Sequence, residues 1–268
     1  MRSIKSNLSS WIISAITYLT LALICVFLSP LGIPEVWASY AGIGGSSIKP
    51  EVVLTNFFAI VISLTIHEFA HAWVADRMGD PTPARYDRLN LNPITIMKAH
   101  PFGALIVPLI GSMNGFLIAW AATPVNPNLV YRKYTVRQAE RWISLAGPIS
   151  NVLLAIITAL IVVGLNLFLS DGQKDLMKPL IDLTGTLVLT NVFLALFNLI
   201  PVPPLDGFTA LDNSLPRDLS HVTELIQRYN NMLLMFVFFF GAELLIPVVF
   251  SVFNFIIQSA QMLLGIFV

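Results

Sequence analysis

The residues best suited to chemistry are two histidines and a glutamate within the apolar stretch IHEFAHA at Ile66–Ala72. His67 and His71 are four positions apart, so on a helix both imidazoles project from one face and can bind one Zn²⁺. Glu68 follows the first histidine, where its carboxylate can reach a water on the metal but not easily the metal itself. The spacing predicts a zinc site with Glu68 as general base, which is the chemistry of metal-assisted hydrolysis.

A simpler explanation is that these polar side chains only join neighbouring helices by hydrogen bonds. An ionisable side chain at the centre of a membrane costs about 2.5–3.5 kcal/mol, and such residues usually mark function. His67, Glu68 and His71 place three of them within five positions. This density favours a metal site over helix association.

A catalytic zinc takes three protein ligands and keeps one position open, so a third donor is needed. The nearby positions where a metzincin has a glycine and a histidine hold Val74 and Arg77 instead. The best remaining donor is Asp206, in the stretch NLIPVPPLDG at Asn198–Gly207. Three prolines in this stretch cannot continue a regular helix, so the backbone bends before the aspartate. Alone, Asp206 could be a solvated helix end, but beside the histidine motif we favour ligation.

The composition indicates which elements must position these groups. The chain has 268 residues, of which 56% are hydrophobic and 11% charged, and its mean hydropathy is +0.78. A soluble domain carries about 25% charged residues. The composition therefore predicts an all-α polytopic membrane protein in contact with the lipid bilayer. The net charge of zero gives no indication of a nucleic-acid partner.

Five apolar runs are long enough to cross the bilayer as helices. They are Trp11–Leu28, Val52–Val74, Ile143–Leu169, Leu183–Ile200 and Leu233–Ile257. The first is longer than the usual apolar region of a signal peptide, so we expect it to be retained. The C-terminal run is too long for one straight span, and we expect Pro247 to divide it and its second half to lie along the interface.

A sixth apolar segment, Phe102–Ile118, contains Pro108, Gly111 and Gly115, which weaken a helix. If this segment enters and leaves on one side, twelve of the 15 Lys and Arg residues share the cytoplasmic side. This positive-inside bias predicts five to six transmembrane helices plus a re-entrant or hairpin element.

No polar gap between apolar runs reaches the ~50 residues that a soluble domain needs. We therefore expect a single membrane-embedded domain over residues 1–268. Within it, residues 1–51 form an N-terminal helix and outer loop, 52–207 the catalytic core and 208–268 the C-terminal helices.

Further segments accompany the histidine motif in a fixed order. They are HEFAHAWVADRMGDPTPAR at His67–Arg85, LNPI at Leu91–Ile94, HPFGALIVPL at His100–Leu109, AWAATPVNP at Ala119–Pro127, SLAGPISN at Ser144–Asn151 and NVFLALFNLIPVPPLDG at Asn191–Gly207. Over about half of its length the chain thus resembles the site-2 protease family of intramembrane zinc metalloproteases, in its compact subgroup without PDZ or CBS domains. Ala70 replaces a glycine often seen in the family motif.

The resemblance implies that His67, His71 and Asp206 bind zinc and that Glu68 is the catalytic base. It also implies that Asn198 lies near the substrate backbone. The interpretation is a metalloendopeptidase that hydrolyses peptide bonds in or near transmembrane segments of membrane proteins. We expect a multi-pass protein of the plasma membrane with its active site near the cytoplasmic face, where water can reach the metal.

Two alternatives remain open. A non-catalytic homologue could bind transmembrane segments without cleaving them, although it would have no use for Glu68. An ion or proton transporter could use His67, Glu68 and Asp206 as a relay, although such transporters often have paired halves and this sequence shows no repeat. Asn126 and Asn151 could either hydrogen-bond a bound peptide or join helices.

Overall fold

The computed structural model describes residues 49–113 and 119–265. The predicted first helix Trp11–Leu28 and nearly all of the N-terminal region 1–51 lie outside the described residues, as do the last positions of the segment Phe102–Ile118. The described part of the chain is helical and contains no strand. Its α-helices are α3 (Pro50–Arg77), α4 (Thr82–Arg85), α5 (Pro93–Ala99), α6 (Val107–Met113), α7 (Val136–Phe168), α8 (Asp171–Asn198), α9 (Asp206–Asp212), α10 (Ser220–Arg228) and α11 (Asn230–Gly265).

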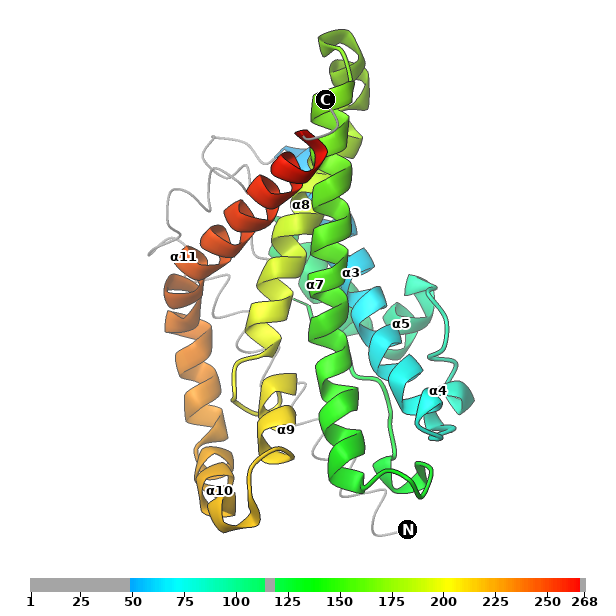
Figure 1. Ribbon diagram of the computed structural model, residues 1–268, viewed down its shortest axis with the longest axis vertical. Coiled ribbons are helices and arrows are strands. Elements are labelled where there is room, and N and C mark those ends of the chain that lie inside the picture. Colours follow the sequence, from blue (N-terminus) through cyan, green and yellow to red (C-terminus); the bar gives the residue numbers. More distant parts are fainter. Residues whose placement is uncertain (1–48, 114–118, 266–268) are drawn as a thin grey trace.

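Four long helices form the framework, with α3, α7 and α8 side by side and α11 packed on α7 and α8 (Figure 1). Their segments Pro50–Arg77, Val136–Phe168, Asp171–Asn198 and Leu244–Gly265 are each long and apolar enough to cross a membrane. The protein is therefore an all-α polytopic membrane protein, as predicted.

The observed helices extend beyond the apolar runs used to predict them. Helix α7 begins at Val136, where the Thr135 hydroxyl accepts from the Gln138 N–H at 3.2 Å and the Gln138 side chain accepts from the Thr135 N–H at 3.0 Å. Helix α8 begins at Asp171 instead of Leu183. A helix can continue into water with charged residues, so apolar length alone underestimates it.

The core where the long helices meet is built from small and β-branched side chains. Ala155 and Ala159 of α7 are fully buried, and they pack in one cluster with Ile60 of α3, Val188 of α8 and Val249 of α11. In lipid, helix association depends on close packing, which small residues allow. Larger apolar side chains on the outside of α7 remain exposed, as expected of a lipid-facing surface.

The described part of the sixth apolar segment, Phe102–Met113, is a short helical element. A π-helical turn at Phe102–Ile106 leads directly into α6, so the helical part of Phe102–Met113 is about 18 Å long against a bilayer core of ~30 Å. The Trp120 N–H, just after the segment, donates to the Gly103 carbonyl near its beginning at 3.0 Å. A Cβ on Gly103 would collide with that tryptophan's backbone. This geometry supports the predicted re-entrant or hairpin element, although the described part is more regularly helical than expected.

Helix α11 is continuous through Pro247, which was expected to divide it. Figure 1 shows that the helix changes direction part-way along instead. A proline inside a helix removes one hydrogen bond and produces a kink, and membrane helices tolerate this. Its second half, Leu244–Gly265, is itself a candidate span, so its expected position along the interface is not required.

Candidate metal centre

The two histidines of the motif lie on α3, one turn apart and buried. Their Nε2 atoms are 3.0 Å from each other. His71 and His67 are six and ten residues before the end of α3, or about 9 Å and about 15 Å along the helix. The imidazoles therefore lie in the C-terminal half of α3.

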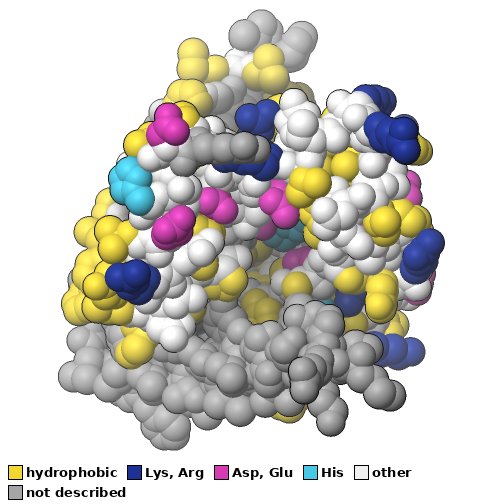
Figure 2. All heavy atoms as spheres, turned by 90° about the horizontal axis from the view of Figure 1, so that it is seen from below, with side chains coloured by type: hydrophobic (Ala, Val, Ile, Leu, Met, Phe, Trp, Pro, Cys, Tyr) yellow, Lys and Arg dark blue, Asp and Glu magenta, His cyan; other side chains and the backbone are white. Residues whose placement is uncertain are grey.

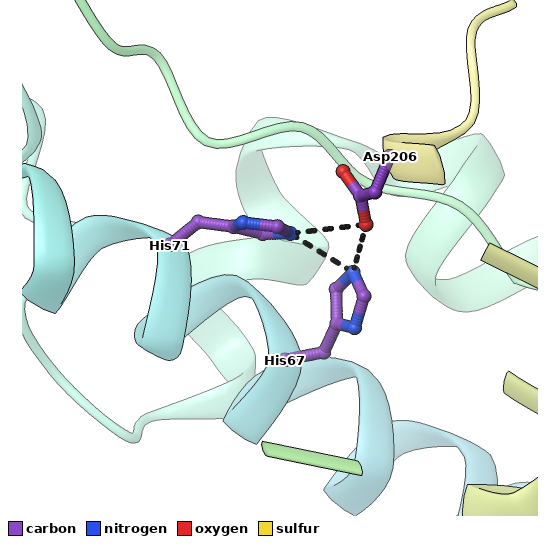
Figure 3. A group of neighbouring side chains, drawn as sticks. All are labelled: His67, His71 and Asp206. Atoms are coloured by element: carbon purple, nitrogen blue, oxygen red, sulfur yellow. Dashed lines mark hydrogen bonds and ion pairs between the residues drawn. The ribbon is translucent and has the colours of Figure 1, made fainter. Parts of the chain in front are cut away.

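Asp206 reaches the histidines from the turn between α8 and α9. Helix α8 ends at Asn198, the proline-containing segment follows, and α9 begins at Asp206 itself. The Asp206 Oδ2 atom is 3.2 Å from the His67 Nε2 and 3.4 Å from the His71 Nε2 (Figure 3). A Cβ on Gly207 would overlap the Leu199 backbone, so glycine is needed for the two ends of this turn to approach so closely.

The three donor atoms have the spacing of a zinc site. Tetrahedral zinc with bonds of ~2.0–2.2 Å separates its ligand atoms by roughly 3.3–3.6 Å, and the separations here are 3.0, 3.2 and 3.4 Å. The Asp206 side chain is 21% exposed, whereas those of His67 and His71 are 6% and 10% exposed. The three side chains thus have a spacing that suits a metal ion. The site is most accessible to solvent on the side of Asp206.

The carboxylate of Asp206 is held in its charged form. Burial by itself would raise the pKa of this carboxyl, but the nearby His71 and His67 outweigh it and keep the pKa well below its usual range. An anionic carboxylate oxygen is also a suitable donor for a divalent cation.

Helix α7 provides polar contacts to the Nδ1 atoms of both histidines. The His71 Nδ1 lies 2.6 Å from the Ile143 carbonyl oxygen, which can only accept, so Nδ1 carries a proton, and in the neutral imidazole the lone pair is then on Nε2, which faces the cluster. The His67 Nδ1 lies 3.2 Å from the amide nitrogen of Asn151.

Gly147 of α7 faces the same two rings. A Cβ at this position would collide with ring atoms of both His67 and His71. The backbone of α7 therefore packs directly against the imidazoles, and a glycine is required for that contact.

Glu68 is buried beside the cluster and its carboxylate is held by a threonine. The Thr123 hydroxyl lies 2.7 Å from the Glu68 Oε2 and 3.0 Å from the Glu68 carbonyl oxygen, and its single proton can be donated to either. Thr123 belongs to the segment Ala119–Asn126, which has no regular secondary structure. Glu68 thus has a fixed orientation, as a general base needs.

The segment Ala119–Asn126 is anchored near its middle and at its C-terminal end. The His100 Nε2 donates to the Ala122 carbonyl near the middle at 2.9 Å. At the C-terminal end the buried Asp80 accepts from the Asn126 N–H at 2.5 Å. His100 thus supports the segment that carries Thr123, and Asn126 is held through its backbone.

Asn198, the other predicted site residue, lies at the last position of α8. Its side-chain amide donates to the Leu194 carbonyl of its own helix at 3.0 Å. In this conformation the amide is directed to its own helix, so its predicted contact with a substrate stays a prediction.

Sequence reasoning assigned no role to Thr123 or Gly147 and left that of Asn151 open. All three lie in the segments AWAATPVNP and SLAGPISN, which carried the resemblance. The available signals were a glycine in an apolar helix and an asparagine one turn beyond it, both of which point to close packing or polar contacts.

The centre lies at one end of the molecule. Figure 2 views this end, where α9 and α10 lie, and shows acidic side chains around a hollow with a histidine at depth. Several Lys and Arg side chains also lie on the described part of this face (Figure 2). The site is therefore near a charged, water-compatible end of the helices.

Comparisons with known proteins agree with this chemistry. The model of "Peptidase family M50" matches residues 55–182. YwhC of Bacillus subtilis (strain 168), named as a zinc metalloprotease, is 33% identical over 171 residues, which cover 63% of this chain and 71% of YwhC. Rip2 of Mycolicibacterium smegmatis, also named as a zinc metalloprotease, is 30% identical over 195 residues, 71% of this chain and 70% of Rip2. Rip2 of Mycobacterium tuberculosis H37Rv is 29% identical over the same length. No solved structure matches the chain.

Proposed function

The chain belongs to peptidase family M50, the site-2 protease family of zinc proteases, and from this premise we propose that it hydrolyses peptide bonds in or beside transmembrane segments of membrane proteins. The observation that carries the proposal is the convergence of two imidazoles and a carboxylate on one point within a bundle of apolar helices. A soluble metalloprotease would not need to bury such a centre among helices of this length and hydropathy.

His67, His71 and Asp206 are the proposed ligands of one zinc ion. Zinc held there supplies a Lewis acid that polarises a scissile carbonyl and lowers the pKa of water to about 7. The partial exposure of Asp206 leaves a side from which water and substrate can approach.

Glu68 is the proposed general base. Its carboxylate accepts the proton of the attacking water, and it then donates that proton to the amine that leaves when the C–N bond breaks. The Thr123 hydroxyl holds one carboxylate oxygen at 2.7 Å, which orients the other oxygen for proton transfer.

The substrate must present an extended backbone, because a helix uses its carbonyls in its own hydrogen bonds. The irregular segment Ala119–Asn126 passes Glu68 and has backbone groups that could pair with such a strand. Asn198, close in sequence to Asp206, is the proposed contact to the substrate backbone. The proposed location is the plasma membrane with this end of the bundle on the cytoplasmic side, because the basic residues of α3 and α7 gather there.

The decisive substitution is Glu68→Gln in the purified full-length protein, assayed on a protein substrate with a transmembrane segment. We expect zinc to remain bound and cleavage to fall by at least 10²-fold, since general acid–base catalysis contributes 10²–10⁴-fold. Glu51→Gln, an exposed site at the other end of α3, is the matched control and should cleave normally.

Cleavage that survives in the Glu68→Gln protein would refute this mechanism. His67→Ala should lose both zinc and cleavage. Native protein that binds the substrate and zinc without cleaving would instead support a non-catalytic binder, and zinc-free native protein would support a transporter.

A further inference from the structure

Asn151 has the most unusual environment of the polar residues next to the proposed zinc site. It lies on α7, its side chain is 0% exposed, and its amide nitrogen is 3.2 Å from the His67 Nδ1. Within the described residues its amide oxygen is buried without a hydrogen-bond partner. A buried carbonyl oxygen without a partner is unfavourable, so this amide requires an explanation.

The way in which a histidine binds zinc offers an explanation for this unpartnered amide oxygen. For His67 to present the lone pair of Nε2 to zinc, its ring proton must be on Nδ1. A protonated Nδ1 facing an amide NH₂ would place two donors against each other. The oxygen and nitrogen of an asparagine amide have nearly the same shape and exchange places by a 180° rotation. That rotation places the unpartnered oxygen against the Nδ1–H.

We infer that Asn151 is a positioning residue that accepts a hydrogen bond from the His67 Nδ1–H and so fixes the tautomer and direction of this imidazole. The Ile143 carbonyl, on the same helix, does the same for His71 at 2.6 Å. Helix α7 thereby orients both histidines of α3. This inference rests on the proposed zinc site and adds a residue that supports it.

The competing explanation, that Asn151 only joins α7 to α3, has a matched control within the chain. Asn191 of α8 is also 0% exposed, also has an unpartnered amide oxygen, and donates to the Ser63 hydroxyl of α3 at 2.8 Å. Asn191 thus joins two helices without touching a zinc ligand. Substituting each asparagine in a separate variant therefore separates an effect on the orientation of the His67 imidazole from an effect on helix packing.

The experiment measures zinc affinity of the full-length protein by competition with a chelator. We expect Asn151→Leu to weaken zinc binding by about 10–100-fold, the usual effect of removing such a partner. Asn151→Asp keeps an acceptor oxygen and should bind zinc within a few-fold of the native protein. Asn191→Leu should also stay within a few-fold, even if its thermal unfolding in the metal-free state shifts as much as that of Asn151→Leu.

A second measurement needs no substitution at Asn151. In zinc-loaded native protein labelled with ¹⁵N-histidine, the inference expects a protonated Nδ1 on both His67 and His71. An unprotonated Nδ1 on His67 overturns the inference, and so does native zinc affinity in Asn151→Leu with cleavage intact. The proposed function survives both of those results, whereas native protein that binds no zinc overturns both proposals.

Discussion

At the scale of single residues, the candidate site consists of two groups of side chains with different tasks. His67, His71 and Asp206 converge within 4.8 Å and offer one donor atom each. Glu68 is next to them in sequence but is held separately, by the hydroxyl of Thr123. The proposed metal ligands and the proposed base are thus oriented by different parts of the chain, so they can be perturbed independently.

Thr123→Val removes the hydroxyl and keeps the shape of the side chain. We expect kcat to fall roughly 10- to 100-fold with zinc content unchanged, because a hydrogen bond to a charged group contributes about 1.5–3 kcal/mol. Thr123→Ser, which keeps the hydroxyl, should retain most of the activity. Loss of zinc in Thr123→Val would contradict this separation of tasks.

At the scale of the elements, α7 has the central role. It packs on both α3 and α8, its small residues belong to the core, and its backbone at Gly147 touches the imidazoles. The turn between α8 and α9 then brings the Asp206 carboxylate to 3.2 Å from the His67 Nε2 and 3.4 Å from the His71 Nε2. The geometry of the site therefore depends on how closely α7 approaches α3.

Gly147→Ala tests this approach. The added methyl group would collide with both histidine rings, so we expect zinc affinity to fall at least 10-fold and cleavage to fall with it. Gly164→Ala is the control on the same helix, because its added Cβ would make only ordinary contacts at 3.9 Å or more. Equal zinc affinity in the two variants would show that α7 does not pack as tightly on the rings as described.

At the scale of the whole molecule, charge and hydropathy decide how the protein lies in the membrane. The end of the bundle with the site carries the basic residues of α3 and of the start of α7, whereas Lys174 and Lys178 are at the other end, on α8. The exposed side chains between the ends are largely apolar. The proposed orientation therefore has the site close to the cytoplasm.

Cysteine labelling of intact cells checks this orientation. In a background of Cys25→Ala, which removes the single cysteine of the chain, we expect Asp175→Cys to react with a membrane-impermeant maleimide. Arg132→Cys should react only after the cells are permeabilised. Both positions are exposed, so access to the reagent depends on the side of the membrane. The reverse labelling pattern would contradict the proposed topology.

The sequence by itself determined the features that depend on short-range periodicity and on whether a segment lies in lipid or in water. The four-residue spacing of His67 and His71 predicted that both rings share one face of a helix, and apolar length predicted the spans in α3, α7 and α8. It also predicted that the backbone bends before Asp206, because prolines cannot continue a helix. These inferences needed only neighbours along the chain.

Only the tertiary structure decided which surfaces meet across helices. The contact of Thr123 with Glu68, the fit of Gly147 against the imidazoles and the position of Asn151 behind His67 could not be derived from spacing. The reason is that lipid is as apolar as the side chains that face it, so hydropathy identifies a membrane helix without showing which of its faces packs on a neighbour. Small residues and individual hydrogen bonds determine that choice, and their partners lie far away in the sequence.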